Sequence, residues 1–89
     1  MVTVILTHEV KNFSEWKRAF DADDSNRQQA GVKINGVYNS IDNPNVVTII
    51  SEFPSAEALS GMMSNPDMKA TMEAAGVIGV PEAKILNKL

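Results

Sequence analysis

The chain has 89 residues and a net charge of −3. Its length predicts one domain, 1–89. Because it has no cysteine, disulfides, thiolate metal sites and cysteine nucleophiles are excluded. The lysines are scattered and there is one histidine, which argues against nucleic-acid binding and against a His-rich metal centre. No apolar run is long enough for a membrane span and the N-terminus does not read as a secretory signal, so we expect a cytoplasmic protein without membrane contact.

The first expected element is a strand from Val2 to Val10, because this segment is rich in β-branched residues and lacks glycine and proline. Alternate residues of a strand point to opposite faces. The more apolar face is made by Val2, Val4, Leu6, His8 and Val10. This alternation predicts that His8, the one histidine, faces the core.

A helix should follow the strand and run to about Ala30, where Gly31 ends it. Asn12 with Glu15 three residues later fits a capping box, and Ser14 is an equally good N-cap. At 100° per residue, the stripe on one side of this helix is Trp16, Phe20, Asp23, Arg27 and Ala30. The stripe begins aromatic and ends with an acid and a base.

Two strands, Val32–Ile41 and Asn45–Phe53, are expected next as a hairpin, because Asp42-Asn43-Pro44-Asn45 between them is typical turn sequence. Ser55 then caps a second helix. Asn65-Pro66 restarts that helix, since Asn is a good N-cap and Pro is tolerated at the first helical position.

The second helix should end at Gly76, and its inward side carries Leu59, Met62, Met63, Met68, Met72 and Ala75. The segment 77–81 is expected to be a connector. Ala83–Leu89 alternates well enough to be a last strand.

This order of elements is typical of an α+β fold of the ferredoxin-like βαββαβ type, in which two helices cover one face of a four-stranded antiparallel sheet. Apolar residues such as Ile5, and Val37 or Ile49, occur on strands that carry apolar residues on both sides. The uncovered face is therefore expected to be buried by a second copy. Two sheets packed face to face around a two-fold axis would make a dimeric α+β barrel.

The sequence also resembles a known group, the small cyclase-like proteins of the dimeric α+β barrel superfamily, which contains the antibiotic biosynthesis monooxygenases. Nearly the whole chain takes part in the resemblance. It is carried by His8, Asn12–Lys17, Arg27 ahead of Gly31, Tyr38–Ser40, Asp42–Asn45, Glu52-Phe53, Asn65-Pro66 and Ala74–Val77. The resemblance implies a homodimer and a cofactor-independent monooxygenase or cyclase acting on an aromatic or polyketide-like small molecule. Fold similarity alone does not fix the reaction.

The resemblance implies that members of the haem-degrading branch of that superfamily have a histidine on the second helix. Here the corresponding helix carries methionines and no histidine. Haem degradation is therefore not expected, and no metal or other cofactor is implied.

His8 has two interpretations. Its ordinary pKa near 6.5 would let it act as a general base, or it could be a core histidine held by a backbone carbonyl. Trp16 more often packs in a core than binds a ligand, although its indole N–H could point into a pocket. Arg27 could pair with Asp23 one turn earlier, or could anchor an anionic substrate.

Tyr38 and Glu52 should lie near each other if the hairpin has the simplest register. Tyr38 could donate a hydrogen bond to a substrate oxygen, or be a half-exposed strand tyrosine. Glu52 could be a second base, or could cap the helix that begins after Ser55. The methionines, Met72 among them, could be adaptable core or a ligand-facing wall.

The leading hypothesis is an enzyme pocket between sheet and helices, with His8 as proton acceptor and Trp16, Arg27 and Tyr38 as orienting donors. The alternative is a non-catalytic dimeric ligand-binding or scaffold protein. A cavity of about 300 Å³ or more, lined by both His8 and Arg27, would favour the enzyme. A filled interior with Arg27 in solvent would favour the alternative.

Overall fold

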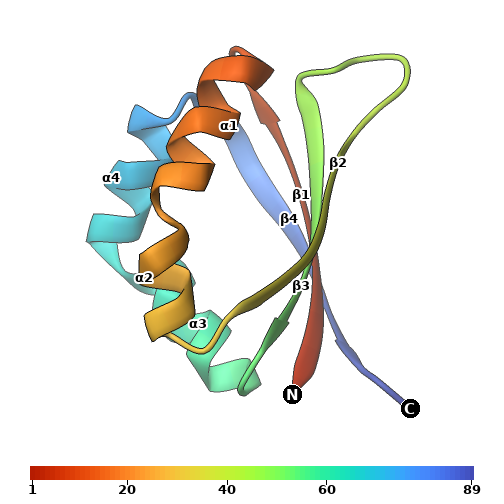
Figure 1. The fold of residues 1–89 in the computed structure, drawn as a ribbon, viewed down its shortest axis with the longest axis vertical. Helices are drawn as coiled ribbons and strands as arrows, with labels where there is room; N and C mark the ends of the chain where they lie inside the picture. Colours follow the sequence, from red (N-terminus) through yellow and green to blue (C-terminus); the bar gives the residue numbers. More distant parts are fainter.

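A computed structural model describes residues 1–89, and it has one antiparallel sheet of four strands in the order β2-β3-β1-β4. The strands are β1 (Val2–Val10), β2 (Lys33–Asn39), β3 (Val46–Phe53) and β4 (Val77–Asn87). The helices are α1 (Phe13–Ala22), α2 (Asp24–Gln29), α3 (Ala56–Ser64) and α4 (Pro66–Ala74). All four helices lie on the same side of the sheet (Figure 1). The predicted α+β, ferredoxin-like architecture is confirmed. No helix is both long and apolar enough to cross a membrane.

The first helical segment begins at the expected place, because the Asn12 side chain accepts a hydrogen bond from the backbone N–H of Glu15 at 3.0 Å. Asn12 is therefore the N-cap and Ser14 is not. The prediction of one continuous helix to Ala30 is wrong, since α1 ends and α2 begins at Asp23. The Asp23 N–H donates to the Phe20 carbonyl three residues earlier, and this tight last turn ends α1.

The second helical segment follows the predicted caps. The Ser55 hydroxyl accepts from the Ala58 N–H at 3.1 Å and begins α3. The Asn65 side chain accepts from the Asp67 N–H at 2.9 Å and begins α4, with Pro66 at its first position. Each cap satisfies a backbone donor that the helix itself leaves free.

The expected connector over 77–81 is wrong, because β4 already begins at Val77. Val77 pairs with Val10 and Ile78 with Glu9, and pairing resumes at Glu82 opposite Thr7. Between these two stretches the β4 segment 79–81 has no partners and His8 is skipped in the register. Pro81 is tolerated here because β4 is an edge strand and this part makes no ladder bonds.

The inner face of the sheet carries the core, in two buried clusters under the helices. One is made by Val4, Val32, Phe53 and Leu59. The other is made by Val10, Trp16, Val47 and Ile49. Val4, His8 and Val10 are buried at alternate positions of β1 while Glu9 is exposed. The predicted inward face of the first strand is confirmed.

The outer face of the sheet has no helix over it (Figure 1). Ile5 lies opposite Ile50, and the hydroxyls of Thr7 and Thr48 are hydrogen-bonded at 3.1 Å. Ile49 does not belong to this face, because it is 6% exposed and lies in the core beneath the helices. Val37 is opposite Ile49 and packs against the same core cluster.

Candidate functional site

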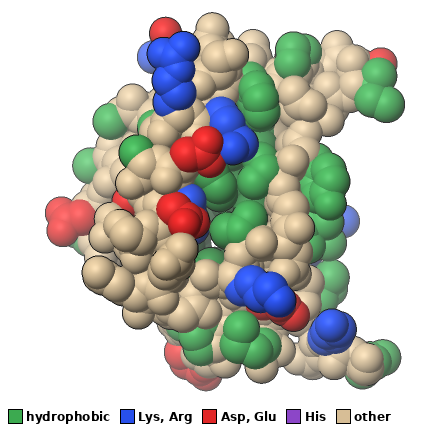
Figure 2. Space-filling model, in the orientation of Figure 1, with side chains coloured by type: hydrophobic (Ala, Val, Ile, Leu, Met, Phe, Trp, Pro, Cys, Tyr) green, Lys and Arg blue, Asp and Glu red, His purple; other side chains and the backbone are tan.

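A cavity of about 120 Å³ lies between the sheet and the helices. Eleven of its fifteen lining residues are hydrophobic, and both His8 and Arg27 are among the lining residues. Figure 2 shows hydrophobic side chains gathered between the helical layer and the strands, with charged side chains beside them. The expected lining is present, but the volume is below the roughly 300–1,000 Å³ usual for ligand sites.

His8 is placed on β1 so that its ring is almost completely buried, with 5% of the residue exposed. The ring meets Trp16 edge-on, with 5.4 Å between ring centroids. Neither ring nitrogen has a hydrogen-bond partner. Burial lowers the pKa of His8 below its ordinary value of 6.5, because the charged form is poorly solvated there. At neutral pH the imidazole is therefore neutral and can accept a proton.

This pKa difference predicts how stability depends on pH. The unfolded chain protonates His8 near pH 6.5 and the folded protein only at lower pH, so the unfolded state binds more protons between these two values. The free energy of unfolding should fall as pH drops below about 6.5 and the loss should level off below the folded pKa. Urea unfolding of the native protein and of His8→Gln across this range isolates the effect. Parallel pH curves for the two proteins would contradict it.

Trp16 is held by α1 between two other rings. It stacks on Phe20 at 4.9 Å and lies 5.4 Å from His8. It is 3% exposed, belongs to the core and also lines the cavity. Trp16 therefore packs in the core and at the same time offers a cavity wall.

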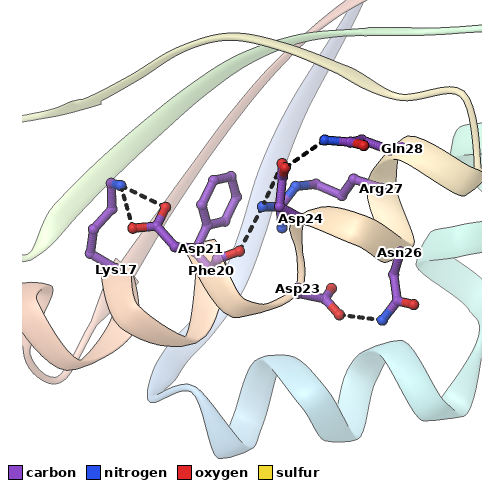
Figure 3. A network of polar contacts seen from close by, with 8 residues as sticks. All are labelled: Lys17, Phe20, Asp21, Asp23, Asp24, Asn26, Arg27 and Gln28. Carbon is purple, nitrogen blue, oxygen red and sulfur yellow. Dashed lines mark hydrogen bonds and ion pairs between the residues drawn. The ribbon is translucent and has the colours of Figure 1, made fainter.

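Arg27 points inward from α2, as expected from its position on the aromatic stripe. Its guanidinium lies 3.8 Å over the Phe20 ring, and Nη2 donates to the Phe20 carbonyl at 2.6 Å (Figure 3). The side chain is 12% exposed, and Nε is buried without a partner. Arg27 thus places a cation at the cavity, and its buried Nε–H has no partner in the protein.

The expected ion pair of Arg27 with Asp23 is wrong. Arg27 Nη2 lies 3.4 Å from Asp24 Oδ1, while Asp23 accepts a hydrogen bond from Asn26 (Figure 3). The reason is the helix break at Asp23. Asp23 is the N-cap of α2, whereas Asp24 is in the first turn of α2, three residues before Arg27. The Phe20 contact could not be inferred from spacing alone, because the partner is a backbone carbonyl, which also accepts from the Asp23 N–H, and not an acidic side chain.

Tyr38 and Glu52 do not lie together and neither lines the cavity. Tyr38 is opposite Thr48 and Glu52 is opposite Lys33, so about 13 Å of strand separates them at roughly 3.3 Å per residue. Both share the outer face with Thr48, and Tyr38 is 55% exposed. The expectation that they are neighbours is wrong, and α3 is capped by Ser55 rather than by Glu52.

The methionines of α3 and α4 line the cavity, which makes them a wall of the candidate site. They are Met62, Met63, Met68 and Met72. Their flexible thioether side chains can adjust to the shape of a ligand. Leu6 and Thr71 also line the cavity and were not among the predicted site residues, although Leu6 shares the strand face of His8. No cluster of three or more acidic or histidine side chains is arranged to hold a metal ion.

Comparison with solved structures shows that the fold is shared with several small bacterial and archaeal proteins. A Bordetella bronchiseptica protein provisionally named an antibiotic biosynthesis monooxygenase has a TM-score of 0.77 and 12% identity, covering 99% of this chain and 96% of its own. A Caulobacter crescentus protein with the same provisional name has a TM-score of 0.74 and 18% identity, covering 99% and 89%. A conserved protein of Methanosarcina mazei has a TM-score of 0.72 and 18% identity, covering 99% and 92%.

The resemblance to antibiotic biosynthesis monooxygenases is confirmed at the level of the fold, since these identities are too low to carry an activity. No functionally curated protein matches the sequence. One family model matches residues 1–85, almost the entire chain, and its description is a domain of unknown function, DUF3764. The chain therefore belongs to the DUF3764 family and has the fold of the antibiotic biosynthesis monooxygenases.

Proposed function

We propose that the protein is a cofactor-independent monooxygenase- or cyclase-like enzyme that takes an aromatic or polyketide-like small molecule into the cavity between sheet and helices. The observation that carries the proposal is the His8 imidazole, buried and neutral, with neither nitrogen bound by the protein. A buried polar group without partners is costly to a fold and is uncommon unless it serves a purpose.

His8 would accept a proton from an acidic C–H or O–H of the substrate, leaving an enolate or phenolate. The Trp16 and Phe20 rings offer an apolar wall for a flat substrate, and Arg27 Nε–H is a donor for a substrate oxygen. A charge inside an apolar cavity acts more strongly than in water. Arg27 would therefore stabilise the anion that His8 creates.

In the monooxygenase version of the reaction, molecular oxygen is the oxidant. One oxygen atom enters the substrate, so that a CH₂ group becomes C=O, and the other leaves as water. The protein's part is proton removal, orientation and exclusion of solvent. The proposed reaction does not require a cofactor bound to the protein.

The small volume favours a second candidate, the non-catalytic dimeric ligand-binding or scaffold protein. A cavity of about 120 Å³ is closer to the engineered cavities that hold one benzene ring than to an enzyme site. The two candidates make different predictions for the same compound, because a binding protein would hold it unchanged.

Oxygen uptake with anthrone, whose CH₂ group is acidic, separates the two candidates. The enzyme is expected to consume one O₂ for each molecule converted to anthraquinone, faster than buffer alone. Mass spectrometry of the product checks that one oxygen replaced two hydrogens. Binding of anthrone with no increase in oxygen uptake would support the non-catalytic protein instead.

A further inference from the structure

A second hollow, of about 310 Å³, lies directly beside the cavity, between α4 and the start of β4. Three residues, Met63, Met72 and Val77, line both the cavity and this outer hollow. The two spaces are therefore neighbours with a common wall. The outer hollow is the larger of the two and also adjoins Lys69 and Glu73.

The outer hollow arises from the irregular pairing of β4. Glu9 pairs with Ile78 and Thr7 with Glu82, so the segment 79–81 bulges away from β1 opposite His8. Gly79 has φ 74°, a left-handed conformation that suits glycine. All three bulge residues line the hollow. The hollow therefore forms at the sheet edge beside the strand position of His8.

The common wall is built from parts that can move. None of the nine residues of α4 is buried, and α3 buries only Leu59. Met63 is 36% exposed, and Met72 is half-buried. Methionine is unbranched, so its side chain can change rotamer without displacing the helix backbone. Segments with little buried surface are those that open at low free-energy cost.

We propose that Met63 and Met72 form a movable partition that sets the size of the ligand. A one-ring compound fits the cavity with the partition closed. A larger compound parts the two methionines, keeps its acidic group at His8 and places its far end in the outer hollow. This inference rests on the proposed use of the His8 cavity as the binding site. It resolves the mismatch between the small cavity and the volume that ligand sites usually have.

The test compares binding of phenol and of 2-naphthol by calorimetry, with the native protein and the double variant M63I/M72I. Isoleucine nearly conserves volume but is stiff at χ1. The double variant is expected to lose about tenfold or more in affinity for 2-naphthol relative to its affinity for phenol, so that the ratio of the two affinities changes. Met68 lines only the cavity, so Met68→Ile is the matched control and should not change the ratio of the two affinities.

Met72→Ala shortens one side chain of the partition and is expected to raise the affinity for 2-naphthol. This variant provides the test if circular dichroism shows that the double variant folds poorly. The partition is overturned if the double variant has the same ratio of phenol to 2-naphthol affinity as the native protein, including the case in which both affinities fall equally. That result would leave the proposed function standing. Failure of the native protein to bind either compound overturns both proposals.

Discussion

His8→Gln is expected to lower the turnover of an oxidised substrate by about 10²- to 10⁴-fold, the usual effect of losing a general base. Glutamine keeps a donor and an acceptor in the space of the imidazole but cannot take up a proton near neutral pH. Because His8 has no protein partner, its removal breaks no hydrogen bond. The variant should therefore stay folded, as monitored by circular dichroism, while oxygen uptake is lost.

A matched control is available on the neighbouring strand. Ser51 is 3% exposed and polar like His8, but it does not line the cavity. Ser51→Ala should leave turnover unchanged. The native rate should also decline as pH falls through the lowered pKa of His8, since protonation removes the base. Full activity in His8→Gln would make His8 a structural residue and would remove the proton-acceptor role from the proposed mechanism.

The parts of the site that sequence analysis placed correctly are those set by local periodicity. Alternation along β1 put His8 on the inward face, and helical spacing put Trp16 and Arg27 on one stripe. Such periods survive in the structure because one residue of slip would move an apolar face into water. The caps at Ser55 and Asn65 were equally local and equally correct, and Asn12 was one of the two N-caps that the sequence left open.

The errors have different physical origins. The turn between β2 and β3 sets the hairpin register, which places Tyr38 opposite Thr48 and four residues away from Glu52. The start of β4 at Val77 depends on pairing with Val10, far away in sequence. Arg27 contacts Asp24 and not Asp23 because the helix breaks at Asp23 in a tight turn. Helical periodicity does not indicate this break.

The outer face of the sheet is expected to be the surface where two copies of the chain meet. We predict a two-fold dimer in which the outer faces of two sheets pack together, because Ile5 and Ile50 lie side by side on a face that no helix covers. A domain of this size has a small core, and a second sheet would bury these apolar side chains. Light scattering of the native protein at micromolar concentration should give the mass of two chains.

Ile50→Lys should convert this dimer to monomers and weaken association by about 100-fold or more, since an unpaired charge buried in an interface costs several kcal/mol.

Ile41 provides the matched control. It is completely exposed in the β2–β3 loop and outside the sheet, so Ile41→Lys adds the same charge and should leave the mass unchanged. A native protein that is a stable monomer, or equal effects of the two lysines, would show that the outer face is not where copies meet. Because the outer face is opposite the cavity, the monomeric Ile50→Lys protein should still bind phenol if the site is built from one chain alone.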